Sequence, residues 1–293
     1  RLYQSGNRWS LPATSRKSPF PSFRKTVKID GEVEWARLYT TALGAFDMYI
    51  DGSRVGVKNG DNILYDELKP GYTDQAKTVH YYTYDVTDAL QENATHLLSA
   101  QLAKGWYGGL SGAVSSTLAL RAKLLVKYAG QSDPVVIGTD GSWKTAYPSG
   151  FIFAAIYDGE TFDGNMDNRW QSDPNYDDSA WGQATVLNGW NGKIKPVSGS
   201  RVQLRDDLTR DAYAVTVYDG TTGADNDQYG VINVVGRYTQ DDTFTLRAGE
   251  TAVIDFGQNF AGWPEITASG AKETVITMRT GEMLNDANGL ISR

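Results

Sequence analysis

The sequence predicts an all-β protein built from two consecutive β-sandwich or jelly-roll domains, the second of which we expect to be incomplete. Short segments in which apolar and polar residues alternate recur along the chain, and this twofold period is typical of half-buried strands. The chain also contains 31 Gly, 8 Trp, 17 Tyr and 9 Phe, a bias that favours strands joined by tight turns. Evenly spaced short strands with few helical stretches indicate sandwich architecture.

The elements of the first domain follow from local patterns. Residues 1–29 are polar, rich in Pro and without periodicity, which predicts an extended arm. Strands are expected over residues 34–42 and 46–50, and Asp51-Gly52 predicts a tight turn because both residues tolerate positive φ. Further strands are expected at 79–86, 97–102, 135–137 and 151–156. Residues 118–128 contain Leu and Ala, which suit a helix, but alternation over eleven residues favours a strand.

Two loops each contain an Asp, a Ser and a Trp. In residues 140–143 and 177–181, the Asp is expected to accept a backbone hydrogen bond two residues on, while the Trp holds the loop against the sandwich. Near residues 188–199 the composition shifts to Gly, Asn, Ser and Pro, so we place a domain boundary between residues 30–190 and 191–293. Strands of the second domain are expected at 214–218, 231–235, 243–247, 251–256, 265–268 and 274–279.

Composition excludes several functional classes. The net charge of −7 disfavours nucleic acid as a partner. The chain has no Cys and only two His residues, which argues against disulfides, thiolate chemistry and a multi-His zinc site. There is no apolar run long enough for a membrane span. A serine-hydrolase triad is disfavoured because no Gly-x-Ser-x-Gly motif is present.

Three groups of residues are candidates for binding, each with a structural alternative. Trp106, Tyr107 and Trp170 are candidates to stack on sugar rings, although most aromatic residues pack in cores. Asp158 and Glu160 are two residues apart, so both side chains can share one strand face and accept sugar hydroxyls; solvated turn acids are the alternative.

Calcium is more plausible than zinc for the oxygen-rich loops of this chain. Asp61 and Asn62 follow a Gly in a polar loop that suits a hard cation. A second polar cluster lies at residues 163–168. An Asx turn, in which the side chain bonds nearby backbone, is the alternative for both clusters.

Several segments together resemble the N-terminal region of bacterial α-L-rhamnosidases, glycoside hydrolase family 78. They include Gly105-Trp106-Tyr107 and Asp255-Phe256-Gly257-Gln258-Asn259, and the matching segments are 36–44, 49–56, 68–73, 82–87, 105–107, 157–163, 255–263 and 279–284. Their order and spacing extend over about 250 residues, and such agreement strengthens the individually moderate matches.

The resemblance implies a secreted, periplasmic or extracellular bacterial hydrolase, a glycosidase that removes terminal α-L-rhamnose from glycans with inversion. In that family the acid and base lie on a C-terminal (α/α)6 barrel, so this chain is expected to carry no catalytic residues and to be inactive alone. Its expected partners are that barrel, in the same polypeptide, and a rhamnose-containing glycan. Some members bind rhamnose through calcium in the first sandwich, which we map to Asp61 and Asn62, but Gly108 stands where those members place Asn.

Four functions remain open from the sequence. The first is an accessory β-sandwich region that supports the barrel and binds carbohydrate. The second is a stand-alone carbohydrate-binding module, and the third is a purely structural domain with an apolar docking patch. The fourth, a complete small enzyme, would need an acid pair in a deep cleft. If the second sandwich is incomplete, its open edges would be covered by further chain or by a second copy in a homodimer.

Overall fold

The computed structural model describes residues 20–107, 117–157, 159–219, 233–284 and 291–292. The chain divides into two compact units after Leu204. We call residues 20–204 the sandwich unit and residues from Arg205 onward the C-terminal unit, and each is described by itself.

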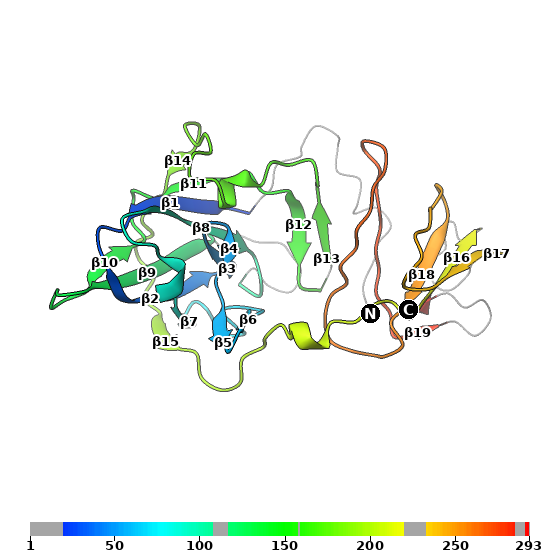
Figure 1. Cartoon of the computed structure of the whole chain (residues 1–293), viewed down its shortest axis with the longest axis horizontal. Coiled ribbons are helices and arrows are strands. Elements are labelled where there is room, and N and C mark those ends of the chain that lie inside the picture. The colour runs from blue at the N-terminus through cyan, green and yellow to red at the C-terminus, as the bar shows by residue number, and fades with distance from the viewer. Residues whose placement is uncertain (1–19, 108–116, 158, 220–232, 285–290, 293) are drawn as a thin grey trace. The chain divides into compact units, whose positions relative to one another are not determined.

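Two antiparallel layers form the sandwich unit (Figure 1). One is a six-stranded sheet in the order β14 (Gly182–Gln183), β11 (Lys144–Ala146), β1 (Ser22–Lys28), β8 (Thr95–Ala103), β3 (Ala45–Ile50) and β4 (Ser53–Arg54). The other is a five-stranded sheet in the order β10 (Val135–Gly138), β9 (Ala119–Tyr128), β2 (Val33–Leu43), β7 (Thr78–Asp85) and β15 (Lys193–Pro196). Strand β15 runs parallel to its neighbour, β7, and the other described strands of these two sheets pair antiparallel.

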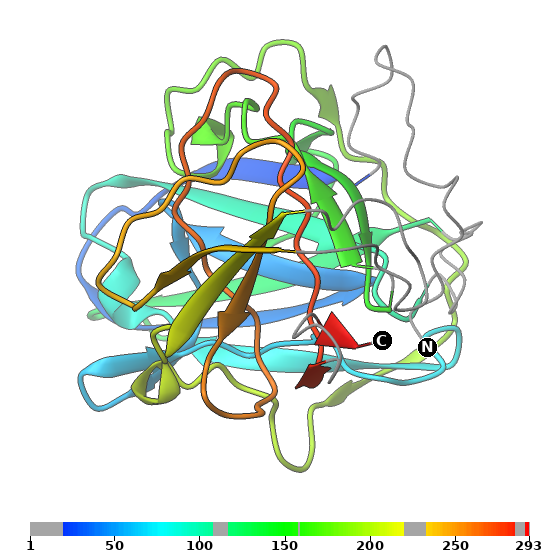
Figure 2. The same cartoon turned by 90° about the vertical axis from the view of Figure 1, so that its right-hand side faces the viewer.

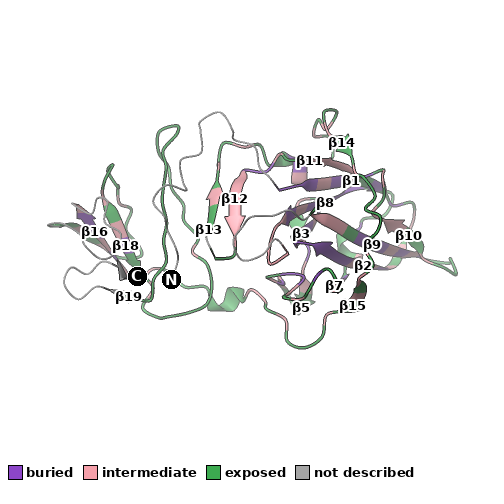
Figure 3. Cartoon of the chain, turned by 180° about the vertical axis from the view of Figure 1, so that it is seen from behind, coloured by how far each residue is buried: buried purple, intermediate pink, exposed green. Residues whose placement is uncertain are grey.

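Alternate residues of both sheets point inward and build one core. Phe46 and Met48 of β3 and Leu98 of β8 come from the first sheet, and Leu38 of β2 and Leu124 of β9 come from the second; all are 5% exposed or less. Figure 3 shows this buried interior in purple. The twofold alternation read from the sequence therefore corresponds to real inward faces, and the predicted all-β sandwich is confirmed.

Smaller elements complete the sandwich unit. Two hairpins lie outside the main sheets: β5 (Val57–Asn59) with β6 (Asn62–Leu64), and β12 (Phe151–Ala155) with β13 (Gly159–Phe162). Short 3-10 helices occur at Thr87–Ala89 and Arg169–Gln171, and a third, Asp206–Leu208, belongs to the C-terminal unit. In the described ranges, no helix is long and apolar enough to cross a membrane.

Several local expectations are confirmed. Residues 118–128 form strand β9 rather than a helix. Asp51 and Gly52 both have positive φ and join β3 to β4. The Asx turns also form, with the amides of Ser142 and Ser179 donating to Asp140 and Asp177. Trp143 is 1% exposed and donates to the Gly138 carbonyl, 3.0 Å away.

The polar N-terminal segment departs from the sequence prediction. Residues 22–28, expected in an extended arm, form β1 between β8 and β11. The strand buries Arg24, which pairs with Asp178 at 3.1 Å and lies over the rings of Tyr176 and Trp181. Arg24 lies on the face opposite Phe23 and Val27, which pack in the core, so a pattern of apolar residues does not show that this position is buried.

The end of the sandwich unit also lies beyond the position read from composition. Strand β15, after residue 190, pairs with β7. The buried Asp66 carboxylate then accepts hydrogen bonds from Arg201 at 2.9 Å, Gln203 at 3.0 Å and Tyr84 at 2.9 Å. These contacts attach residues 191–204 to the sandwich.

In the C-terminal unit, one three-stranded sheet is formed by β17 (Asn233–Tyr238), β16 (Ala214–Asp219) and β18 (Thr251–Asp255). These strands are coloured olive to orange in Figure 2. A short pair, β19 (Met283–Leu284) and β20 (Ile291–Ser292), follows. Residues 243–247, 265–268 and 274–279 were expected to be strands and are not. They are mostly exposed, and no neighbouring strand in the described chain pairs with them.

Candidate functional site

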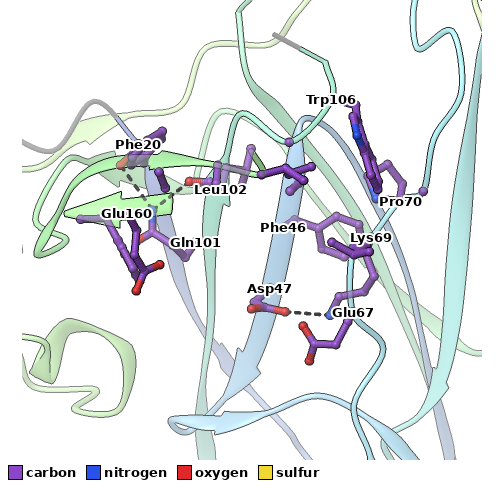
Figure 4. A pocket seen from close by; sticks show the side chains of 18 of the residues that line it. Phe20, Phe46, Asp47, Glu67, Lys69, Pro70, Gln101, Leu102, Trp106 and Glu160 are labelled. Atoms are coloured by element: carbon purple, nitrogen blue, oxygen red, sulfur yellow. Dashed lines mark hydrogen bonds and ion pairs between the residues drawn. The ribbon is translucent and has the colours of Figure 1, made fainter. Parts of the chain in front are cut away.

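A pocket of about 240 Å³ lies on the sandwich unit. Strands β3 and β8 contribute Asp47 and Gln101, which are directly opposite each other in the sheet. The β12–β13 hairpin contributes Glu160, and the loop after β8 contributes Trp106. Figure 4 shows these side chains around one cavity, with Glu160 and Trp106 on opposite sides of the view. The pocket thus combines residues from segments that are far apart in the sequence.

Part of the pocket wall is a closed network of charges. The Asp47 carboxylate accepts from Arg54 at 2.9 Å and from the Lys69 ammonium at 2.8 Å. Arg54 also donates to Glu67 at 2.6 Å. Burial opposes the charge of Arg54, but the hydrogen bond to Glu67 and the negative charge of Asp47 raise the pKa of Arg54 overall. Because each of these acids already has a cation, the network holds the wall in place rather than offering a free acid.

Gln101 is held equally firmly. Its amide nitrogen donates to the Leu102 carbonyl at 3.0 Å and its amide oxygen accepts from Ser22 at 2.9 Å. Figure 4 marks its contacts with the backbone of Phe20 and Leu102. The Gln101 side chain is therefore already hydrogen-bonded within the protein. It forms part of the pocket wall rather than offering free donors or acceptors to a ligand.

Aromatic side chains gather at Trp106. The indole nitrogen donates to the Tyr157 hydroxyl at 3.2 Å, and the Tyr72 ring meets the indole edge-on with centroids 5.6 Å apart. Tyr72 and Tyr157 are 77% and 51% exposed. Gly105, at φ 52°, brings the backbone against Ala45, where an added Cβ would lie 3.0 Å from the Ala45 Cβ. This close approach fixes where Trp106 leaves the sheet.

Glu160 differs from the other acids of the pocket. It lies on β13 opposite Ala154 and is exposed. Within the described residues its carboxylate has neither a salt bridge nor a hydrogen bond, whereas Asp47 and Glu67 are both paired. Glu160 is consequently the pocket carboxylate that is free to accept hydrogen bonds from a ligand.

The other carbohydrate-binding residues predicted from the sequence do not line this pocket in the described structure. Tyr107 is half-buried beside Trp106 in the chain but does not line the pocket, and Asp158 lies outside the described residues. Trp170 is 1% exposed and packs 5.9 Å from Trp181. It is a core residue and offers no face to a sugar.

Asp61 and Asn62 lie apart from the pocket, at the tip of the β5–β6 hairpin, where Asn59 pairs with Asn62. Both are exposed. The described residues contain no cluster of three or more His, Asp or Glu side chains suited to a metal ion. Calcium takes six to eight oxygen ligands, more than these two side chains supply, so calcium at this turn stays a prediction.

The second predicted calcium cluster consists of ordinary turns. The amide of Asn165 donates to Asp163 at 3.0 Å. The amide of Arg169 donates to Asp167 at 3.0 Å, and the Arg169 guanidinium binds the same carboxylate. These oxygens satisfy local backbone and side-chain donors, as the Asx-turn alternative predicts.

His96 has a structural role. It lies in β8, is 3% exposed, and its Nδ1 is 2.6 Å from Asp51. Its Nε2 accepts from the Gln91 amide at 2.9 Å. Both ring nitrogens are therefore engaged, and the pair braces the β3–β4 turn instead of activating a nucleophile.

Two families match this chain. Residues 31–206 match the alpha-L-rhamnosidase N-terminal domain, and residues 245–292 match the bacterial alpha-L-rhamnosidase concanavalin-like domain. An alpha-L-rhamnosidase of Streptomyces avermitilis is 31% identical over 261 residues, covering 87% of this chain and 21% of that protein. An alpha-L-rhamnosidase from an Alteromonas species is 28% identical over 283 residues, which cover 94% of this chain and 26% of that protein. The chain thus spans about a quarter or less of these relatives.

Solved structures agree on the fold. A crystal structure of the Streptomyces avermitilis enzyme complexed with L-rhamnose superposes with a TM-score of 0.57 and 28% identity, over 71% of this chain and 21% of that one. The crystal structure of the native alpha-L-rhamnosidase from Aspergillus terreus gives the same TM-score of 0.57 at 22% identity. The superposition covers 76% of this chain and 29% of that one.

Proposed function

Because the chain belongs to the family of alpha-L-rhamnosidase N-terminal domains, we propose that it is an accessory, non-catalytic region of an α-L-rhamnosidase and that its Trp106 pocket binds glycan. On this proposal the sugar is a rhamnose unit, and the acid and base of hydrolysis lie on a barrel domain of the same polypeptide. We propose that the protein is located in the periplasm or outside the cell, where it can reach such glycans.

The observation that carries this proposal is the pairing of an aromatic cluster with one free carboxylate. The rings of Tyr72, Trp106 and Tyr157 offer apolar surface with polar tips, which suits the alternating C–H and hydroxyl groups of a sugar. Trp106 lines the pocket together with Glu160, which adds an acceptor for hydroxyl groups, and Tyr72 and Tyr157 contact Trp106 without lining the pocket themselves. A small pocket with apolar walls and few unpaired polar groups is typical of small-ligand sites.

The same geometry argues against hydrolysis in this pocket. A glycosidase requires two carboxyl groups on either side of the scissile bond, one of them protonated at neutral pH. Two of the three described acids that line the pocket, Asp47 and Glu67, are held by cations, so their oxygens are already engaged within the protein. Glu160 alone cannot supply both roles, so the arrangement supports binding without cleavage.

Isothermal titration of the whole chain with L-rhamnose tests the proposal. We expect binding that Trp106→Ala weakens by about tenfold or more, because a stacked ring and a hydrogen bond are lost together. Trp35→Ala is the matched control: Trp35 is a half-buried tryptophan on β2, away from the pocket, and its loss should leave affinity unchanged.

Two further arms complete the titration. Glu160→Gln keeps the shape of the side chain but removes its charge, and should weaken binding. A chelator should leave binding at Trp106 unchanged, since Asp61 and Asn62, where calcium is predicted, lie apart from this pocket. Absence of L-rhamnose binding, or equal loss in Trp106→Ala and Trp35→Ala, would remove the glycan-binding part of the proposal.

A further inference from the structure

The outer face of the five-stranded sheet carries a second, unrelated hollow of about 590 Å³. Its floor follows from strand register. Tyr39 of β2 is directly opposite Lys123 of β9, and Thr41 is opposite Arg121. Thr40 pairs with Tyr82, so Tyr81 lies beside Thr41 on the same face. Two tyrosines and two cations are thus neighbours on one sheet surface.

The two tyrosines form a tilted aromatic surface. Their ring centroids are 6.1 Å apart with planes at 53°, and both rings are half-buried. Within the described residues neither hydroxyl has a hydrogen-bond partner, in contrast to Tyr84, which donates to Asp66. Each ring therefore presents apolar surface together with an unused polar group.

The charges of this face fall into two classes. Arg37 pairs with Asp85 at 2.7 Å and Lys127 pairs with Glu34 at 2.9 Å. Arg121 and Lys123 are exposed, and among the described residues neither has an acidic partner. They lie on the same face of β9, two residues apart, in a chain whose net charge is −7. This local excess of positive charge is not balanced by the protein itself.

From these features we propose that the hollow binds an anionic sugar, a pyranose ring bearing a carboxylate or sulfate group. The tyrosine surface fits the ring, and an arginine fork with a neighbouring lysine fits the oxyanion. A neutral sugar would leave both cations without a partner. We name Tyr39, Tyr81, Arg121 and Lys123 the anionic-sugar face. It is separate from the Trp106 pocket and does not depend on that site.

Titration of the whole chain with three probes tests the inference: the trimer of galacturonic acid, a sulfated galactose trimer and the neutral galactose trimer. We expect at least one charged probe to bind and the neutral trimer to bind about tenfold more weakly, because a charge-assisted contact is lost. Binding should weaken as salt rises from about 50 to about 300 mM, since these groups are exposed.

Matched double variants separate a built site from general charge attraction. Arg121→Gln with Lys123→Gln should weaken binding of the charged probe by about tenfold or more. Arg37→Gln with Lys127→Gln removes the same charge from the same sheet face and should leave affinity within about twofold. Thermal melts establish that both variants are folded.

Three results would overturn the inference: no binding of either charged trimer, equal affinity for the neutral trimer, or equal loss in the two double variants. Trp106→Ala distinguishes this site from the first one. It should weaken L-rhamnose binding by about tenfold or more while leaving the charged trimer bound as before.

Discussion

The two units of the chain contain similar alternating sequences but bury them to different degrees. In the sandwich unit, two sheets face each other, and Leu38, Leu98 and Leu124 are each about 1% exposed. In the described part of the C-terminal unit, the buried apolar residues are confined to β16 and β18: Val215, Val217, Tyr218 and Val253. Trp263, Val275 and Met283 are more than half exposed. Alternation therefore marks segments able to form strands, while burial requires a second layer to pack against.

The largest expected difference is in independent folding. A fragment of residues 20–204 contains both sheets of the sandwich and should melt in one cooperative transition, because it retains the whole core. A fragment of residues 205–293 should show no cooperative transition, since a single three-stranded sheet buries too little apolar surface. Circular dichroism melts of both fragments measure this. A cooperative melt of the second fragment would contradict the comparison.

Core and surface truncations sharpen the same contrast. Leu124→Ala removes a side chain packed between the two sheets and should lower the free energy of unfolding by about 3 kcal/mol. Val275→Ala, at a position 84% exposed, should change it by less than about 0.5 kcal/mol. Urea unfolding followed by tryptophan fluorescence compares the two, and similar costs would show that Val275 is buried in solution and would contradict the comparison.

The Asp66 network tests where the sandwich unit ends. Asp66→Asn weakens hydrogen bonds from Arg201 and Tyr84 at a fully buried position, and should cost about 2 kcal/mol. Asp207→Asn is the control: Asp207 pairs with Arg205 at 2.6 Å, but both side chains are more than half exposed, so the pair contributes little. Equal effects in urea unfolding would show that Asp66 does not attach residues 191–204 to the core.

Alkaline pH should produce the smallest effect, and it acts on the sandwich unit. Burial and the carboxylate of Asp47 raise the pKa of Tyr49 to about 12, while tyrosine in the unfolded chain ionises near pH 10. A raised pKa means that stability is complete below about pH 10 and falls as pH rises toward about 12.

At pH 11 the cost from Tyr49 is about 1.4 kcal/mol. Tyr49→Phe should reduce the loss of stability between pH 9 and pH 11 by about this amount, as measured by urea unfolding at each pH. Because Tyr84 is also buried and its pKa is raised, part of the loss should remain. An unchanged pH dependence in Tyr49→Phe would contradict the assignment.

Sequence patterns predicted the parts of the fold in which apolar periodicity and turn chemistry agree. Strand β9 and the Asp51-Gly52 turn are examples, since inward Leu124 and Val126 and the positive φ of both turn residues are local properties. Strand β1 could not be found this way, because its buried Arg24 is stabilised by Asp178, far along the chain. The strands expected at 243–247 and 274–279 did not form for the converse reason: their pattern is present, but no strand in the described part of the chain pairs with them.

The candidate pocket was predicted only in part. Trp106 and Glu160 were singled out from composition and spacing, and both line it. Tyr72 and Tyr157 were missed as individual residues, although both lie within or beside segments that resemble the rhamnosidase family. Tyr72 and Tyr157 belong to the aromatic cluster because each contacts Trp106. Both are more than 30 residues from Trp106 in the chain, so no local pattern reveals these contacts. Trp170 shows the reverse case, because composition cannot distinguish a buried tryptophan from an exposed one.

The most direct test of the central claim is to measure binding and hydrolysis in one sample of the chain. An aryl α-L-rhamnoside is added, and bound ligand and released phenol are followed together. Binding by the Trp106 pocket without release of phenol is the result we predict, since the pocket has one free carboxylate among its described residues. Steady release of phenol that Glu160→Gln abolishes would contradict the account, because it would place catalysis in the sandwich unit.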